Sequence, residues 1–261
     1  MTYGFLGCGN MGGAIARAVS QVTKDVLLTD RSGRGKALAQ ELGVQYTDAA
    51  EIALSCERIF LAVKPQMMEE ALSPIRDTLQ EQKPLLITMA AGLTMDKIEA
   101  MAGGNLPVIR IMPNTPAMIG AGMTQYCCNS LVTPEMEQEF LSVMRFTGHL
   151  DKLEEHLIDA ASALSGCGPA YMYLFLEGLA DGAVACGIPR AKAYEYAAAT
   201  MEGAARLILE TGSHPGQLKD AVCSPAGSTI QGVRVLEEKG IRAAAMDCVI
   251  AAFEKNRKLG G

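Results

Sequence analysis

The sequence predicts an α/β protein in two parts. The first is an N-terminal Rossmann dinucleotide-binding domain with a mostly parallel sheet over residues 1–152, and the second is an all-helical domain over residues 153–261. Three observations lead to this prediction. Short apolar β-type runs alternate with helical patterns up to about residue 150, and a glycine-rich turn follows the first run. Beyond about residue 154, Ala, Leu, Gly and Met recur at helical spacing.

Six strands are expected in the first part, each a short run rich in apolar residues. They lie at Tyr3–Leu6, Val26–Thr29, Arg58–Val63, Leu85–Thr88, Val108–Met112 and Met123–Cys128. Helix signals lie between them: an Asp-x-x-Glu box begins at Asp48, Thr133 and Pro134 form a cap and a first-turn proline, and Gly43 ends a helical run. Alternation of strands and helices in this order predicts a parallel sheet.

The second part is expected to be helical throughout. The predicted helices lie at Leu157–Ser165, Ala170–Cys186, Arg190–Glu210, Gln217–Val222, Ile230–Glu238 and Ile241–Leu259. Small residues such as Ala197, Ala198 and Gly203 allow close helix packing, and they leave more apolar face than one copy of the chain can bury. We therefore hypothesise that this part forms a homodimer.

The glycine-rich turn is the strongest functional signal in the first part. Gly7, Gly9 and Gly12 follow an apolar strand and open a helix, with Asn10 and Met11 between them. In a strand-helix-strand unit this spacing binds a dinucleotide, because the glycines allow a tight turn, approach of the pyrophosphate and close packing of the helix on the strand. The alternative is a plain glycine turn without a ligand.

Asp30 and Arg31 end the second predicted strand, where the residue that selects the ribose is expected. A carboxylate there would accept a hydrogen bond from the 2′-hydroxyl of NADH, whereas a guanidinium, with help from Arg34, would hold the 2′-phosphate of NADPH. Both side chains could also be solvated turn charges. The sequence favours NADPH slightly and leaves NADH open.

Loops after three further strands fall at the same edge of the sheet. They contain Val63, Lys64 and Pro65 after the third predicted strand, Ala91 and Gly92 after the fourth, and Asn114 after the fifth. We expect these residues to contact the cofactor, since ligands bind at the carboxyl ends of parallel strands. The alternatives are an ordinary surface lysine at position 64 and a rigid proline turn around Asn114.

A second small-residue turn, from Ser224 to Thr229, directly precedes the amphipathic run 230–236. It predicts a helix N-terminus without bulky side chains, whose free N–H groups and dipole attract a small carboxylate. Ser224, Gly227, Ser228 and Thr229 are the expected substrate-binding residues.

Composition excludes several other classes of function. The formal charge is −6, which argues against a nucleic-acid partner, and no apolar run reaches the length that spans a membrane. Eight scattered cysteines form no C-x-x-C pair, and three histidines complete no metal site. We expect reduced, mostly buried thiols, no metal and a cytoplasmic location.

Taken together, the motifs identify a family that the chain resembles, pyrroline-5-carboxylate reductase. The resemblance covers essentially all 261 residues, with the blocks in the family's order and spacing. The blocks are Gly7-Cys-Gly-Asn-Met-Gly12, Val63-Lys-Pro-Gln66, Arg110-Ile-Met-Pro-Asn-Thr-Pro116, Gly166-Cys-Gly-Pro-Ala-Tyr171, His214-Pro-Gly-Gln-Leu-Lys219 and Ser224-Pro-Ala-Gly-Ser-Thr229. This chain has Cys167, Ala226 and Ser228 where the family usually has Ser, Gly and Thr, and Ala226 puts a backbone with positive φ in doubt.

The resemblance implies reduction of 1-pyrroline-5-carboxylate to L-proline by NAD(P)H, in a homodimer or a larger assembly of dimers. It implies that Ser224 and the main chain of Gly227, Ser228 and Thr229 hold the carboxylate, and that the Thr229 hydroxyl contacts the ring nitrogen. Two alternatives remain open from the residues alone. One is a β-hydroxyacid dehydrogenase with a catalytic lysine at Lys192 or Lys219, and the other is a dinucleotide sensor without activity.

Overall fold

The computed structural model describes residues 1–259, which form two compact units. Of these residues, the first unit contains 1–167 and 252–259, and the second contains 168–251. The units divide later in the chain than the predicted domain boundary at residues 152 and 153, which stays a prediction about domains. Each unit is described separately below.

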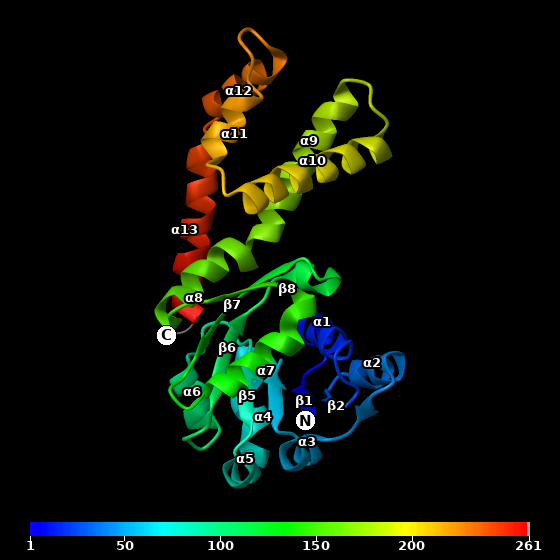
Figure 1. Ribbon diagram of the computed structural model, residues 1–261, viewed down its shortest axis with the longest axis vertical. Coiled ribbons are helices and arrows are strands. Elements are labelled where there is room, and N and C mark those ends of the chain that lie inside the picture. Colours follow the sequence, from blue (N-terminus) through cyan, green and yellow to red (C-terminus); the bar gives the residue numbers. More distant parts are fainter. Residues whose placement is uncertain (260–261) are drawn as a thin grey trace. The chain divides into compact units, whose positions relative to one another are not determined.

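The first unit contains one eight-stranded sheet in the order β3-β2-β1-β4-β5-β6-β7-β8 (Figure 1). Its strands are β1 Tyr3–Leu6, β2 Val26–Thr29, β3 Gln45–Tyr46, β4 Arg58–Leu61, β5 Leu85–Thr88, β6 Val108–Met112, β7 Gly122–Cys128 and β8 Gly148–Lys152. Strands β1 to β6 run parallel, β7 is antiparallel to β6, and β8 is parallel to β7. The mostly parallel Rossmann sheet is thus confirmed, with two short strands, β3 and β8, that the sequence did not predict.

Helices cover both faces of this sheet because both faces of its central strands are apolar. Helices α1 Asn10–Val19, α2 Arg34–Leu42 and α7 Pro134–Met144 enclose one buried cluster, in which the rings of Phe5 and Phe60 stack with centroids 4.5 Å apart. Helices α3 Ala49–Ser55, α4 Met68–Leu72, α5 Arg76–Gln82, α6 Met95–Met101 and α8 Glu155–Ala161 enclose the other cluster.

The predicted helix ends hold in the structure. Asp48 caps α3 by accepting a hydrogen bond from the Glu51 N–H at 2.9 Å, and Thr133 caps α7 by accepting one from the Met136 N–H at 3.3 Å. Gly43 ends α2 with φ of +65°, a left-handed conformation that favours glycine. The helix predicted at Leu157–Ser165 begins earlier, as α8, and continues as a π-helical turn at Ser162–Gly166.

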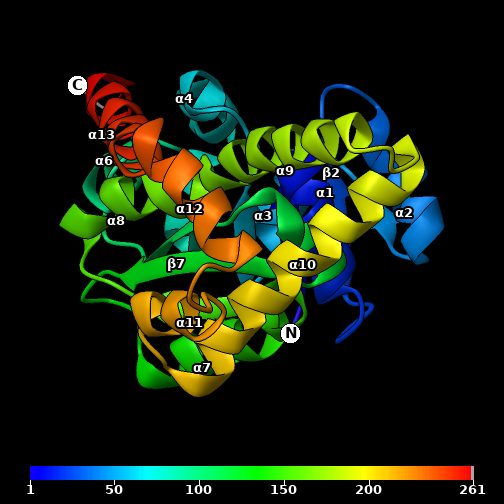
Figure 2. The same cartoon turned by 90° about the horizontal axis from the view of Figure 1, so that it is seen from above.

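The second unit is all helix, as predicted. Helices α9 Gly168–Ala185 and α10 Arg190–Thr211 form a hairpin (Figures 1 and 2), followed by α11 Pro215–Ala221, α12 Ser228–Glu238 and α13 Ile241–Leu259, whose C-terminal part belongs to the first unit. The Tyr171 hydroxyl on α9 donates a hydrogen bond to the Cys248 carbonyl on α13 at 3.3 Å.

Candidate functional site: a dinucleotide turn and a carboxylate turn

The turn after β1 requires glycine at two of its three predicted positions. Gly7 has φ of +106°, and a Cβ there would lie 2.6 Å from the Ala62 carbonyl oxygen. A Cβ on Gly12 would lie 2.7 Å from the Ala62 Cβ and would overlap the Gly7 carbonyl oxygen. Strand β1, strand β4 and helix α1 therefore meet too closely here for any side chain.

Gly9 differs from the other two glycines because its Cβ would meet no atom within 4 Å. It stands at the N-cap of α1 in extended conformation, and its carbonyl accepts the first helical hydrogen bond, from the Gly13 N–H at 2.8 Å. The N–H groups of Asn10, Met11 and Gly12 belong to the first turn of α1, and this turn contains no acidic residue. The turn thus leaves open space beside a helix N-terminus, which is the arrangement that binds a pyrophosphate.

A cavity of about 420 Å³ opens at the carboxyl ends of β1, β2 and β4. The topological switch point of the sheet lies here, since β1 is flanked by β2 and β4. The structure brings six of the predicted cofactor residues to this cavity, namely Gly7, Gly9, Asp30, Arg31, Val63 and Lys64. Its volume is within the range of small-molecule sites.

Ten other residues line the cavity, and the four of them with a thiol, hydroxyl or carboxyl group were not predicted as cofactor contacts: Cys8, Thr29, Ser32 and Glu70. Cys8 packs its sulfur 3.6 Å from the Thr29 carbonyl oxygen, and burial raises the pKa of its thiol to about 12. The Cys8 thiol therefore stays protonated and lines the cavity without acting as a nucleophile. Glu70 pairs with Arg31, a contact that no sequence pattern indicated.

The remaining predicted cofactor residues lie beside this cavity or in neighbouring loops. Pro65 opens a 3₁₀ turn directly after Lys64, and Gly92 adopts φ of +75° in the loop after β5 that also contains Ala91. Asn114 is 9% exposed, and its amide is already engaged: Oδ1 accepts from the Met123 N–H at 2.9 Å, and Nδ2 donates to the Ser165 carbonyl at 3.0 Å. Asn114 thus fixes the loop after β6 to β7 and to the π-helical turn.

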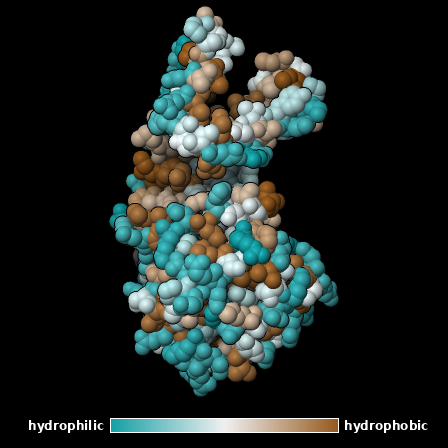
Figure 3. Space-filling view, viewed as in Figure 1, coloured by the Kyte–Doolittle hydropathy of each residue, from teal (hydrophilic) through white to brown (hydrophobic). Residues whose placement is uncertain are grey.

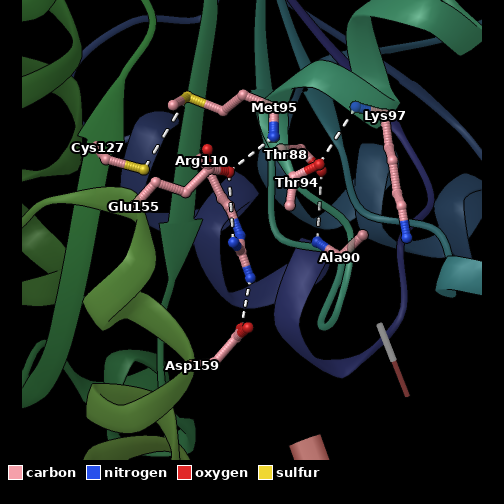
Figure 4. Close-up of polar contacts among 9 residues, drawn as sticks. All are labelled: Thr88, Ala90, Thr94, Met95, Lys97, Arg110, Cys127, Glu155 and Asp159. Atoms are coloured by element: carbon pink, nitrogen blue, oxygen red, sulfur yellow. Dashed lines mark hydrogen bonds and ion pairs between the residues drawn. The ribbon is translucent and has the colours of Figure 1, made fainter. Parts of the chain in front are cut away.

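A buried charge cluster that the sequence analysis missed lies beneath this edge of the sheet (Figure 4). Arg110 on β6 is 1% exposed; its Nη2 lies 2.6 Å from Asp159 Oδ1, and its Nη1 lies 3.3 Å from Glu155 Oε1. The same Glu155 oxygen accepts from the Met95 N–H at 2.7 Å, at the start of α6. One arginine therefore ties α8 to the sheet and, through Glu155, to α6.

In the second unit, the small-residue turn forms the N-terminus of α12, as predicted. The helix begins at Ser228, and Gly227 is its N-cap in extended conformation, without a side-chain cap bond. The Gly227 N–H donates to the Ser224 carbonyl at 3.0 Å, and a Cβ on Gly227 would overlap Ser224 Oγ. Ser224, Ser228 and Thr229 are all exposed, and they flank a helix start whose first N–H groups have no side-chain cap.

Ala226, in the middle of this turn, has φ of +57°. Alanine at this position put a positive φ in doubt, yet the structure has that conformation. A non-glycine residue in the left-handed region is strained by roughly 1–2 kcal/mol. The turn therefore keeps a backbone conformation at Ala226 that alanine by itself disfavours.

Among residues 1–259, no group of three or more His, Cys, Asp or Glu side chains has the arrangement of a metal site. His214 caps α11 by accepting from the Gly216 N–H at 3.0 Å, and His156 Nδ1 lies 3.2 Å from Glu154. All eight cysteines are free, but only Cys8, Cys56 and Cys127 are buried. The prediction of mostly buried thiols is therefore wrong for the helical unit, where Cys186 is exposed.

Comparison with known proteins assigns the glycine turn and the Ser224–Thr229 turn to domains that family models describe. The family model described as pyrroline-5-carboxylate reductase dimerisation matches residues 155–259, and the one described as NADP oxidoreductase coenzyme F420-dependent matches residues 2–92. The pyrroline-5-carboxylate reductase of Escherichia coli is 44% identical over 98% of this chain and 97% of its own length. The chain belongs to the pyrroline-5-carboxylate reductase family.

More distant relatives agree along the whole chain. The pyrroline-5-carboxylate reductase of Methanosarcina acetivorans is 38% identical over 98% of this chain and 97% of its own length. The crystal structure of Plasmodium falciparum pyrroline carboxylate reductase with NADP bound superposes with a TM-score of 0.88 at 30% identity, covering 100% of this chain and 98% of that one. The resemblance stated from the sequence motifs is confirmed.

Proposed function

We propose that this chain is a pyrroline-5-carboxylate reductase, which transfers a hydride from NAD(P)H to the imine carbon of 1-pyrroline-5-carboxylate and yields L-proline. One observation carries the proposal: the match to a reductase of this name covers 98% of this chain at 44% identity, so it spans both the glycine turn after β1 and the Ser224–Thr229 turn. A dinucleotide-binding fold alone would not establish the reaction.

The dinucleotide is held by the first unit in this proposal. Its pyrophosphate lies on Gly9 and the first N–H groups of α1, at Asn10, Met11 and Gly12, and its adenosine half fills the cavity lined by Asp30, Arg31, Val63 and Lys64. The loops containing Pro65, Ala91 with Gly92, and Asn114 lie toward its nicotinamide half. The open space at Gly9 supports this assignment, since a Cβ there would face no protein atom.

The substrate carboxylate is held by the second unit. The Ser224 hydroxyl and the N–H groups of Ser228 and Thr229 receive it at the start of α12, next to Gly227, where the helix dipole favours negative charge. The Thr229 hydroxyl hydrogen-bonds to the ring nitrogen, which takes up a proton as the imine carbon takes up the hydride. The C=N double bond becomes a C–N single bond, so one hydride and one proton balance the product.

Positioning supplies more of the rate than the threonine hydroxyl does. Fixing two reactants in a reactive pose contributes roughly 7–11 kcal/mol to lowering a barrier, whereas one positioned acid–base group contributes about 100- to 10,000-fold in rate. The ring nitrogen can also be protonated by solvent before binding. The main-chain cradle for the carboxylate is therefore expected to matter at least as much as the Thr229 hydroxyl.

We infer that the helical unit forms the homodimer. Large apolar side chains are exposed along its helices, among them Leu174, Tyr196, Leu209, Val235 and Met246. Hydrophobic residues gather on this unit in Figure 3, and a groove lined by Tyr173, Leu174 and Tyr194 lies between α9 and α10. So much exposed apolar surface is typical of a face that a second copy covers, and the match to a dimerisation model supports this.

The same proposal places the protein in the cytoplasm with small-molecule partners. Eight cysteines without a disulfide fit a reducing compartment. Within residues 1–259, no helix is long and apolar enough to cross a membrane. The net charge of −6 gives no support to nucleic-acid binding.

Oxidation of NADPH and of NADH in the presence of pyrroline-5-carboxylate, followed by absorbance, tests the proposal. Turnover with formation of proline supports it, whereas dinucleotide binding without turnover favours a sensor. A hydroxyacid dehydrogenase would need a free lysine, but Lys192 Nζ lies 2.8 Å from Glu195 and Lys219 is paired with Asp220. Oxidation of 3-hydroxy acids in place of imine reduction would contradict the proposal.

A further inference from the structure

Arg31 and Glu70 form a bidentate ion pair at the cavity that lies at the end of β2. Arg31 Nη1 donates to Glu70 Oε2 at 2.9 Å, and Nη2 donates to Glu70 Oε1. Glu70 lies on α4, and both residues line the cavity that begins at the glycine turn. The guanidinium is therefore occupied by a carboxylate of the protein itself.

Asp30, the neighbouring carboxylate, is engaged within its own loop. Oδ2 accepts from both the N–H and the hydroxyl of Ser32, and Oδ1 accepts from the Gly35 N–H at 2.9 Å. Partial burial opposes ionisation of Asp30, but these hydrogen bonds outweigh it and lower the pKa of the carboxyl. Asp30 thus shapes the loop, and Arg31 is the cation at the end of β2 whose donors could turn to a ligand, while Lys64 lines the cavity after β4.

We propose that Glu70 shifts the preference of the site from NADPH toward NADH by competing with the 2′-phosphate for Arg31. This inference rests on the proposed function. The ribose 2′ group of a dinucleotide falls at the end of the second strand, beside Arg31. Glu70 occupies the end-on fork of the Arg31 guanidinium, formed by Nη1 and Nη2, so a 2′-phosphate that binds through this fork must displace Glu70.

Charge repulsion acts in the same direction. A 2′-phosphate adds nearly two negative charges between the carboxylates of Asp30 and Glu70, whereas the 2′-hydroxyl of NADH adds none. Glu70 therefore weakens the binding of NADPH and leaves the binding of NADH nearly unchanged. Arg31 alone favours NADPH, as predicted from the sequence, and its pairing with Glu70 reduces that preference.

The exposure of the pair limits the size of the effect. The side chains of Arg31 and Glu70 are 66% and 61% exposed, so water and salt screen their attraction. We expect removal of the Glu70 charge to tighten NADP⁺ binding by about three- to tenfold rather than by orders of magnitude. The gain should shrink as the salt concentration rises.

Calorimetric titration of the full-length protein with NADP⁺ and with NAD⁺ tests the inference. In Glu70→Gln, the Kd for NADP⁺ should fall about three- to tenfold while the Kd for NAD⁺ stays within about twofold. The matched control is Glu69→Gln: Glu69 is the adjacent carboxylate, it pairs with Arg76, and it does not line the cavity. This variant should leave the ratio of the two dissociation constants unchanged.

A second variant separates competition for Arg31 from general electrostatics. Arg31→Gln should weaken NADP⁺ binding, and Glu70→Gln added to it should change the ratio of dissociation constants by less than about twofold. An unchanged ratio in Glu70→Gln, or an equal change for both dinucleotides, would overturn the inference alone. If the wild-type protein bound neither dinucleotide, the proposed function would fail and this inference with it.

Discussion

The guanidinium of Arg110 on β6 meets the carboxylate of Asp159 on α8, with Nη2 2.6 Å from Oδ1 in the interior of the first unit. The arginine is 1% exposed, whereas the aspartate is 31% exposed. The Nε atom of Arg110 has no hydrogen-bond partner among residues 1–259. Arg110 is thus a cation shielded from water, and the two carboxylates that pair with it, Glu155 and Asp159, are partly exposed.

Replacing Arg110 with alanine should lower the free energy of unfolding by about 3–5 kcal/mol, because the change leaves a cavity and removes the cation shared by two carboxylates. Urea unfolding measures this. Arg17→Ala is the control, since the exposed pair of Arg17 with Glu41 should contribute less than about 1 kcal/mol. Similar losses for the two variants would show that burial of Arg110 adds nothing to the stability of the fold.

The strands and helix caps could be predicted from local pattern, but this cluster could not. Arg110 stands inside a correctly predicted strand, yet its partners lie 45 and 49 residues further along the chain, on a helix whose start was predicted too late. Strand β8 was missed because Gly148–Lys152 lies at the edge of the sheet and contains one large apolar residue, Leu150, rather than an apolar run. Glu70 was missed because only the folded chain brings α4 to the end of β2.

The glycine turn and the carboxylate turn were predicted because their signals are local. Each requires small residues at fixed offsets before a helix, and the structure places a helix start at both. The conformation of Ala226 needed the structure, because alanine by itself predicts negative φ. Contacts between distant elements therefore account for most of what the sequence analysis lacked.

Gly9→Ala should weaken cofactor binding without lowering stability, whereas Gly12→Ala should lower stability. A Cβ on Gly9 meets no protein atom, so Gly9→Ala should leave the melting temperature nearly unchanged and raise the Kd for NADP⁺ at least tenfold, because the methyl group occupies space near the pyrophosphate. Gly12→Ala should lower the melting temperature by several degrees, since its Cβ overlaps the Gly7 carbonyl. Thermal melting and calorimetric titration of both variants provide the comparison. Unchanged affinity in Gly9→Ala would remove the pyrophosphate from this turn.

Ala226→Gly should raise the free energy of unfolding by up to about 1 kcal/mol. Glycine adopts φ of +57° without steric cost, and this gain exceeds the extra backbone entropy of glycine in the unfolded chain. Ala37→Gly, in the exposed face of α2, is the matched control and should lower it by about 1 kcal/mol. A loss of stability in both variants would mean that Ala226 is not strained.

Thr229→Ala should lower kcat by about 100-fold or more without abolishing turnover, since the hydroxyl assists protonation while the main-chain cradle still positions the substrate. Thr229→Ser keeps the hydroxyl and should retain kcat within about tenfold. Steady-state kinetics with NADPH and pyrroline-5-carboxylate give both values. Complete loss of activity in a Thr229→Ala protein that folds and binds cofactor would contradict the ranking of positioning above proton transfer.

Glu137 on α7 should make the antiparallel edge of the sheet sensitive to acid. It accepts from Lys152 on β8 and from the Tyr126 hydroxyl on β7, each at 2.8 Å. The hydrogen bond from Lys152 is the main cause that lowers the pKa of Glu137 from its usual 4.5. A carboxyl whose pKa is lower in the folded state stabilises the fold above its unfolded pKa, and this stability is lost as the pH falls through the folded value.

Glu137→Gln should therefore be less stable than the wild-type protein at pH 7, by about 1 kcal/mol, and the difference should shrink as the pH falls below about 4.5. Urea midpoints measured across this pH range test the expectation. The matched control is Glu81→Gln, at an exposed position in the last turn of α5, which should follow the wild-type curve. A constant gap between wild type and Glu137→Gln down to pH 3 would mean that the lowered pKa of Glu137 does not contribute to stability, because protonation of the wild-type carboxyl would then cost the fold nothing.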